Sequence, residues 1–61
     1  MNLSQKELQG LQELLDSEQL LVKKYELFAQ NAKEEALRTQ FEQIASAHRG
    51  HYERLRSRLA Q

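Results

Sequence analysis

The sequence predicts an all-α protein: an antiparallel two-helix hairpin that dimerises into a four-helix bundle. Apolar residues recur at alternating spacings of three and four in two stretches of similar length, which is the period of a helix. Proline is absent, so nothing interrupts either stretch. With 61 residues and no cysteine, the chain can bury only a small core and cannot reinforce it with a disulfide. Oligomerisation, a His/Glu metal site or unusually good helix packing has to supplement this core, and a second copy of the chain is the favoured partner.

The first helix is expected over about residues 5–31. Ser4 and Glu7 have the spacing of a capping box, which marks the start of a helix. Along one face of this helix, a single acidic residue, Glu18, interrupts an apolar row consisting of Leu11, Leu15, Val22, Tyr25 and Ala29. Beside it lies a second row, Leu14, Leu21 and Phe28. A face this wide needs more than one neighbouring helix, as in a four-helix bundle.

A tight turn is expected at about residues 32–34, followed by a second helix over about residues 34–59, so that residues 1–61 form a single αα-hairpin domain. The apolar rhythm loses phase at this point, and Glu34 and Glu35 suit the first turn of a new helix. One uninterrupted helix is the competing model, because Ala-Lys-Glu-Glu-Ala is itself strongly helix-forming. The inner face of the second helix is expected to consist of Leu37, Phe41, Ile44, His48, His51, Tyr52, Leu55 and Leu59.

Three polar residues on these faces are expected to meet: Glu18, His48 and His51. In an antiparallel hairpin that turns near residue 33, residues whose numbers sum to about 66 lie at one level, which sets Glu18 opposite His48. The spacing of three brings both imidazoles to one side of the helix, pointing into the seam. Buried polar groups need partners, so the cluster is either a hydrogen-bond network without metal or a site for a divalent transition metal such as iron or zinc. In a dimer, a two-fold axis at mid-height would bring both copies of the cluster together.

The order Glu18, Tyr25, Phe28-Ala29, Phe41, Ala45 and His51 resembles one half of a ferritin-like protein. Rubrerythrin-type helices carry Glu, then Tyr seven residues later and Phe-Ala, and their second helix carries Phe, a small residue and Glu-x-x-His. Short spore coat F-like proteins are similar in length and in the run Lys-Tyr-x-x-x-Ala. The resemblance implies that Glu18 and His51 are metal ligands. His48 departs from the pattern, because it stands where the family has glutamate.

The resemblance implies a small self-assembling protein of the spore-coat F-like kind, with a structural role and a transition-metal site within the bundle. The alternative is a half-ferritin-like protein that binds and oxidises iron at the dimer interface. Enzymatic activity is thus left open and a structural role is favoured. Nucleophilic catalysis has no support, because cysteine is absent and Ser46 has no recognisable catalytic base.

The charge balance argues against nucleic acid and membranes as partners. Nine Lys and Arg residues match nine Asp and Glu residues, so no overall positive field attracts phosphates. Four arginines between residues 49 and 58 complement the dipole at a helix C-terminus, which is the ordinary role of such cations. No apolar run approaches the roughly 20 residues of a membrane span. The expected location is the cytoplasm, with spore association as an extension that the resemblance implies.

Overall fold

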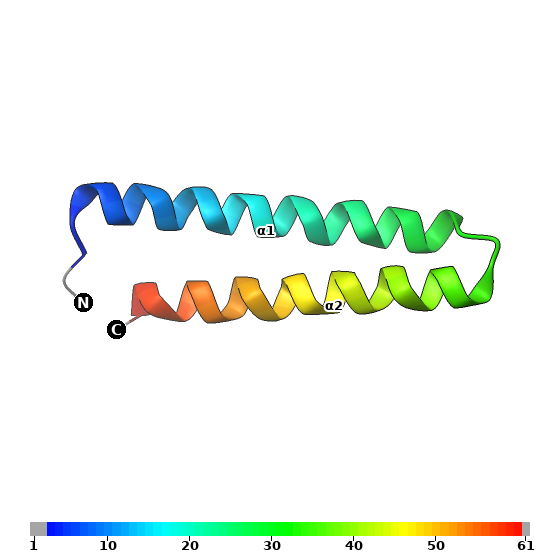
Figure 1. The fold of residues 1–61 in the computed structure, drawn as a ribbon. Helices are drawn as coiled ribbons and strands as arrows, with labels where there is room; N and C mark the ends of the chain where they lie inside the picture. Colours follow the sequence, from blue (N-terminus) through cyan, green and yellow to red (C-terminus); the bar gives the residue numbers. More distant parts are fainter. Residues whose placement is uncertain (1–2, 61) are drawn as a thin grey trace.

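The computed structural model describes residues 3–60 and shows two antiparallel helices joined by a short turn (Figure 1). Helix α1 spans Gln5–Asn31 and helix α2 spans Glu35–Ser57. A 3₁₀ turn, η1, follows over Arg58–Ala60, so the α-helical part of the second helix ends two residues before the expected residue 59. The predicted all-helical hairpin is confirmed, and the model of one uninterrupted helix is wrong. The four-helix bundle stays a prediction.

The capping box at the start of α1 is confirmed. The Ser4 side-chain oxygen accepts a hydrogen bond from the Glu7 backbone N–H at 3.1 Å. In return, a Glu7 carboxylate oxygen accepts one from the Ser4 backbone N–H at 3.0 Å. These two bonds satisfy two of the backbone donors that a helix N-terminus leaves unpaired, which fixes where α1 begins.

The turn between the helices is fixed by backbone geometry and by one arginine. Ala32 and Glu34 have extended backbone angles, so neither residue continues a helix. The Arg38 guanidinium donates a hydrogen bond to the Ala32 carbonyl oxygen at 2.8 Å and pairs with Glu35 at 3.2 Å. Arg38 thereby ties the first turn of α2 back to the end of α1.

The buried core of the hairpin is small. Among the described residues only Leu11, Ala29 and Ala45 are buried, with exposed fractions of 9%, 6% and 1%. Toward the turn, the rings of Tyr25 and Phe28 both lie near that of Phe41, with centroids 6.0 Å and 5.4 Å away respectively. Two helices share a single seam, so most apolar side chains of this hairpin are only partly covered.

Polar contacts close one side of the seam. Arg49 of α2 pairs with Glu26 of α1 at 2.7 Å, and the Gln19 side-chain amide donates a hydrogen bond to the Tyr52 hydroxyl at 3.2 Å. Each contact joins the two helices, so the corresponding flanks of α1 and α2 lie on the same side of the hairpin. On each helix, the two residues that make these contacts lie on the same flank, since the helix turns by about 100° per residue.

Five apolar residues and His51 line the opposite side. On this flank each helix carries one row of residues spaced seven apart. We call these six residues the ladder face: Leu14, Leu21 and Phe28 from α1, and Leu37, Ile44 and His51 from α2. Leu37 and Leu59 were both expected inside the seam, but they are 40% and 45% exposed respectively. The seam lies toward the flank of Ala45, which leaves Leu37 at its edge.

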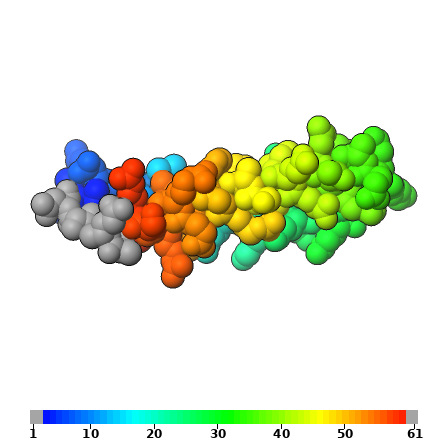
Figure 2. Space-filling model, turned by 90° about the horizontal axis from the view of Figure 1, so that it is seen from below, coloured from blue at the N-terminus to red at the C-terminus, as the bar shows by residue number. Residues whose placement is uncertain are grey.

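The hairpin is long and thin, with Cα extents of 46 × 16 × 10 Å. Figure 2 shows this narrow surface, on which side chains of both helices are exposed. Within residues 3–60, no helix has both the length and the apolar character needed to cross a membrane.

Candidate metal centre

Glu18 joins the two histidines through the two oxygens of one carboxylate. Its Oε1 lies 2.5 Å from Nδ1 of His48, and its Oε2 lies 3.3 Å from Nδ1 of His51. Glu18 belongs to the middle of α1 and both histidines to α2, so the cluster bridges the two helices. The predicted pairing of Glu18 with His48 at one level of the hairpin is confirmed.

The His48 ring is held by neighbours on several sides. The side chain is 22% exposed, and its ring stacks on that of Tyr25 with centroids 6.2 Å apart and planes 16° apart. The His51 ring meets it nearly edge-on, at 5.4 Å and 84°. Together with the bond to Glu18, these contacts fix the position and plane of the His48 imidazole.

His51 lies at the edge of the seam, so the prediction that both imidazoles would be shielded from water is wrong for this residue. Its side chain is 46% exposed, twice the fraction of His48. The physical reason is its place on the helix: three residues after His48, it is rotated by about 60° toward the ladder face. The cluster is therefore covered toward Tyr25 and open toward the ladder face.

The three residues could share one metal ion. Each offers one ligand atom, and these atoms lie within 4.8 Å of one another. A carboxylate and two imidazoles are a common ligand set for zinc and for non-haem iron, with positions left for water or substrate. The donor chemistry and the spacing of Glu18, His48 and His51 thus fit a divalent transition metal.

The same contacts also form a hydrogen-bond network without an ion. If each Nδ1 carries its proton, both rings donate to Glu18, and each Nε2 keeps the lone pair that binds metals. Glu18 then acts as the orienting carboxylate that often stands behind metal-binding histidines. An ion can therefore be bound directly by Glu18 or held by the imidazoles that Glu18 orients.

Tyr25 is the residue of the site that sequence reasoning missed. It was expected as a member of the apolar face of α1 and of the ferritin-like pattern, but not as a support for the His48 imidazole, on which its ring stacks. A signal was present, because Tyr25 stands seven residues after Glu18 and so faces α2 on the same side.

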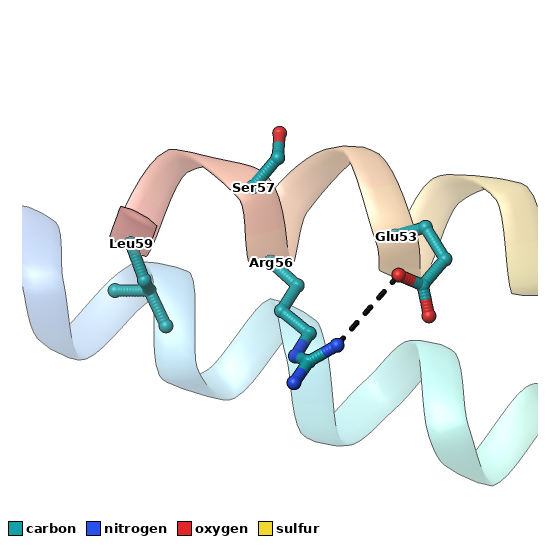
Figure 3. A pocket seen from close by; sticks show the side chains of 4 residues that line it. All are labelled: Glu53, Arg56, Ser57 and Leu59. Atoms are coloured by element: carbon teal, nitrogen blue, oxygen red, sulfur yellow. Dashed lines mark ion pairs between the residues drawn. The ribbon is translucent and has the colours of Figure 1, made fainter. Parts of the chain in front are cut away.

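A hollow near the end of α2 contains none of the three predicted ligands (Figure 3). Glu53, Arg56, Ser57 and Leu59 line it. Arg56 and Glu53 form an ion pair there at 3.9 Å, and both side chains are about two-thirds exposed. A solvated pair of this kind is ordinary surface structure, so this hollow is not a second candidate site.

No family model matches the chain, and neither the curated proteins nor the solved structures give a match. The ferritin-like resemblance therefore stays a prediction. The function of the chain has to be inferred from the geometry of Glu18, His48 and His51.

Proposed function

We propose that this chain is a small structural helical protein whose hairpin binds a divalent transition metal through Glu18, His48 and His51. The observation behind the proposal is the meeting of one carboxylate and two imidazoles within 4.8 Å at the middle of the hairpin. These side chains come from both helices, so a bound ion would cross-link α1 to α2. Metal binding of this kind adds directly to the free energy of folding, which is significant for a hairpin in which only three of the described residues are buried.

The ligand set favours zinc, cobalt, nickel or copper over ferric iron. Imidazole is a ligand of intermediate softness that suits these divalent ions, whereas ferric iron is better matched by several carboxylates. Within the described residues, Glu18 is the only carboxylate of the cluster. The iron-oxidising alternative expects a second carboxylate at position 48, where this chain has histidine. The structural metal site is therefore the better-supported function.

Zinc and cobalt titrations of untagged protein at neutral pH test this proposal. Wild type is expected to show saturable binding by calorimetry, and bound cobalt should give the intense visible absorption of a tetrahedral site. His51→Ala should lower the affinity by at least about tenfold, because it removes one of three ligands. Glu53→Ala is the matched control: it changes an exposed residue of α2 outside the cluster and should leave binding unchanged.

Two results would contradict the proposal. One is a wild-type protein that shows no saturable binding of zinc, cobalt or iron. The other is a His51→Ala variant that binds as tightly as wild type, in which case the cluster is a hydrogen-bond network only. Oxygen consumption during addition of ferrous iron separates the structural site from the iron-oxidising alternative, and His48→Glu should shift the metal preference toward iron.

A further inference from the structure

The ladder face pairs residues of the two helices in three levels, which we call rungs. Leu14 pairs with His51, Leu21 with Ile44, and Phe28 with Leu37. In each pair the residue numbers sum to about 65, close to the value for the contacting Glu18–His48 pair, so each rung lies at about one height of the antiparallel hairpin. Leu14 and Phe28 are 52% and 44% exposed. Three rungs of partly exposed side chains thus lie on the side opposite the Glu26–Arg49 ion pair.

We infer that a second copy of this chain packs on the ladder face and completes an antiparallel four-helix bundle. The seven-residue period of both rows is the first reason. Apolar residues with this period form the seam between packed helices, because they stay on the side that faces the partner. The surface that fits the ladder face is therefore itself made of helices.

Self-complementarity is the second reason. A two-fold axis can lie in the plane of the ladder face in two ways: parallel to the helices, or across them at the middle rung of Leu21 and Ile44. Either axis packs the rungs of one copy against the rungs of the other. In both cases the apolar side chains of the ladder face meet apolar side chains, except that His51 meets a leucine of the second copy. The net charge is zero, so two copies do not repel one another as wholes.

The size of the face is the third reason. The side of the hairpin that carries the ladder face measures 46 × 16 Å, or roughly 700 Å². Stable protein interfaces bury about 800 Å² on each partner. The three rungs, from residue 14 to residue 28 of α1, occupy about 21 Å of this length, so a stable dimer has to use the rest of this side of the hairpin as well.

Two further exposed leucines of α1 do not form a comparable surface. Leu20 and Leu27 are 72% and 57% exposed and lie on the side of α1 that faces away from α2. They have no matching row on α2, so a partner there would contact a single helix. Leu27 therefore provides a control of similar exposure outside the ladder face.

A second copy would also change the metal centre. His51 belongs to the first rung, so the partner covers the open side of the cluster and removes water from it. This consequence rests on the proposed metal-binding function, whereas dimerisation through apolar contacts does not. Dimers should accordingly form without metal, and metal should bind more tightly to the dimer than to the monomer.

Sedimentation equilibrium in the presence of EDTA tests the inference independently of metal. Wild type should be a dimer at micromolar concentration. Leu14→Lys should weaken the dimer by roughly a hundredfold, because it puts an unpaired charge into the interface. Leu27→Lys should dimerise like wild type. A monomeric wild type, or a Leu14→Lys variant as dimeric as wild type, overturns the inference.

Thiol labelling decides the case in which Leu14→Lys does not fold. The natural chain has no cysteine, so Leu14→Cys and Leu27→Cys each introduce a unique thiol. With EDTA present, labelling of the Leu14→Cys variant by a disulfide reagent should slow at least about tenfold as protein concentration rises, because the dimer covers this position. Labelling of the Leu27→Cys variant should not slow. Equal labelling of both variants at all concentrations overturns the ladder face as the interface and leaves the metal proposal untouched.

Discussion

Glu18 determines the chemistry of the cluster, because its one carboxylate contacts both imidazoles. Glu18→Gln keeps the shape of the side chain but replaces the charged acceptor with a neutral amide, a poor metal ligand. Zinc affinity should fall by about 10- to 100-fold, whether Glu18 binds the ion or orients the histidines. Calorimetry measures this loss. Glu26→Gln, which alters the carboxylate paired with Arg49 on the other side of the seam, should bind zinc normally.

Ala45 sets how closely the two helices approach, because at 1% exposure it is the most buried residue described. Ala45→Leu would force extra atoms into the seam and should lower the free energy of unfolding by about 1–3 kcal/mol. Ala47→Leu makes the same change at an exposed position of α2 and should have little effect. Urea unfolding followed by circular dichroism measures both. Equal effects of the two changes would show that α2 has been assigned the wrong inner face.

Part of the site could be predicted from residue positions alone. The level of Glu18 and His48 follows from the position of the turn, since an antiparallel hairpin fixes which residues lie opposite one another. The exposure of His51 could not be predicted in the same way. It depends on which flank of α2 turns toward α1, and a rotation of some tens of degrees moves His51 between seam and surface without changing the apolar period.

At the scale of single elements, the capping box makes the start of α1 sensitive to acid. Hydrogen bonds from Ser4, first from its backbone N–H and then from its side chain, lower the pKa of the Glu7 carboxyl below its ordinary value of 4.5. The ionised form is therefore favoured in the folded state. The resulting stabilisation is present above pH 4.5 and is lost as the pH falls through the lower, folded-state pKa.

The stability difference between wild type and Glu7→Gln measures this effect. It should be largest at neutral pH and should disappear in acid, where the Glu7 carboxyl is protonated in both folded and unfolded chains. Glu13→Gln, at an exposed position further along α1, is the control for the general effect of removing a negative charge. A difference that persists unchanged in acid would mean that the Glu7 charge does not support the cap.

Gly50 weakens α2 without a steric reason. Its φ is not positive, and a Cβ atom there would meet only the Arg54 guanidinium at 3.5 Å, an ordinary van der Waals distance. Gly50→Ala should therefore stabilise the protein by roughly 1 kcal/mol, because alanine loses less backbone freedom on folding. Thermal unfolding measures the change. Destabilisation would instead show that another chain approaches this part of α2 closely.

The start of α1 was predictable from the sequence, whereas the contact that fixes the turn and the form of the last turn of α2 were not. Ser4 and Glu7 identify the start of α1 because a capping box is a local pattern of backbone and side-chain bonds. The tie from Arg38 to the Ala32 carbonyl could not be predicted, since it depends on how the chain leaves the turn. The tightening of the final turn into a 3₁₀ helix is likewise a matter of hydrogen-bond geometry, which sequence periodicity does not specify.

At the scale of the whole molecule, periodicity identifies which faces are apolar but not how much of each face one neighbour covers. The rows Leu11 to Ala29 and Leu14 to Phe28 are both apolar in the sequence. The structure divides them, because α2 covers the first row and leaves the second partly exposed. A two-helix seam is too narrow to bury both rows, and this remaining apolar surface is the one that a second copy would cover.

The stability of the protein should consequently depend on its own concentration. Unfolding of a dimer produces two chains from one particle, so dilution favours the unfolded state. Tenfold steps of dilution in EDTA should therefore lower the unfolding temperature measured by circular dichroism, with the Leu27→Lys variant following wild type. Zinc at about 100 times its dissociation constant should add about 2.7 kcal/mol at each concentration. An unfolding temperature independent of dilution would show that the hairpin folds alone, with the ladder face exposed to water.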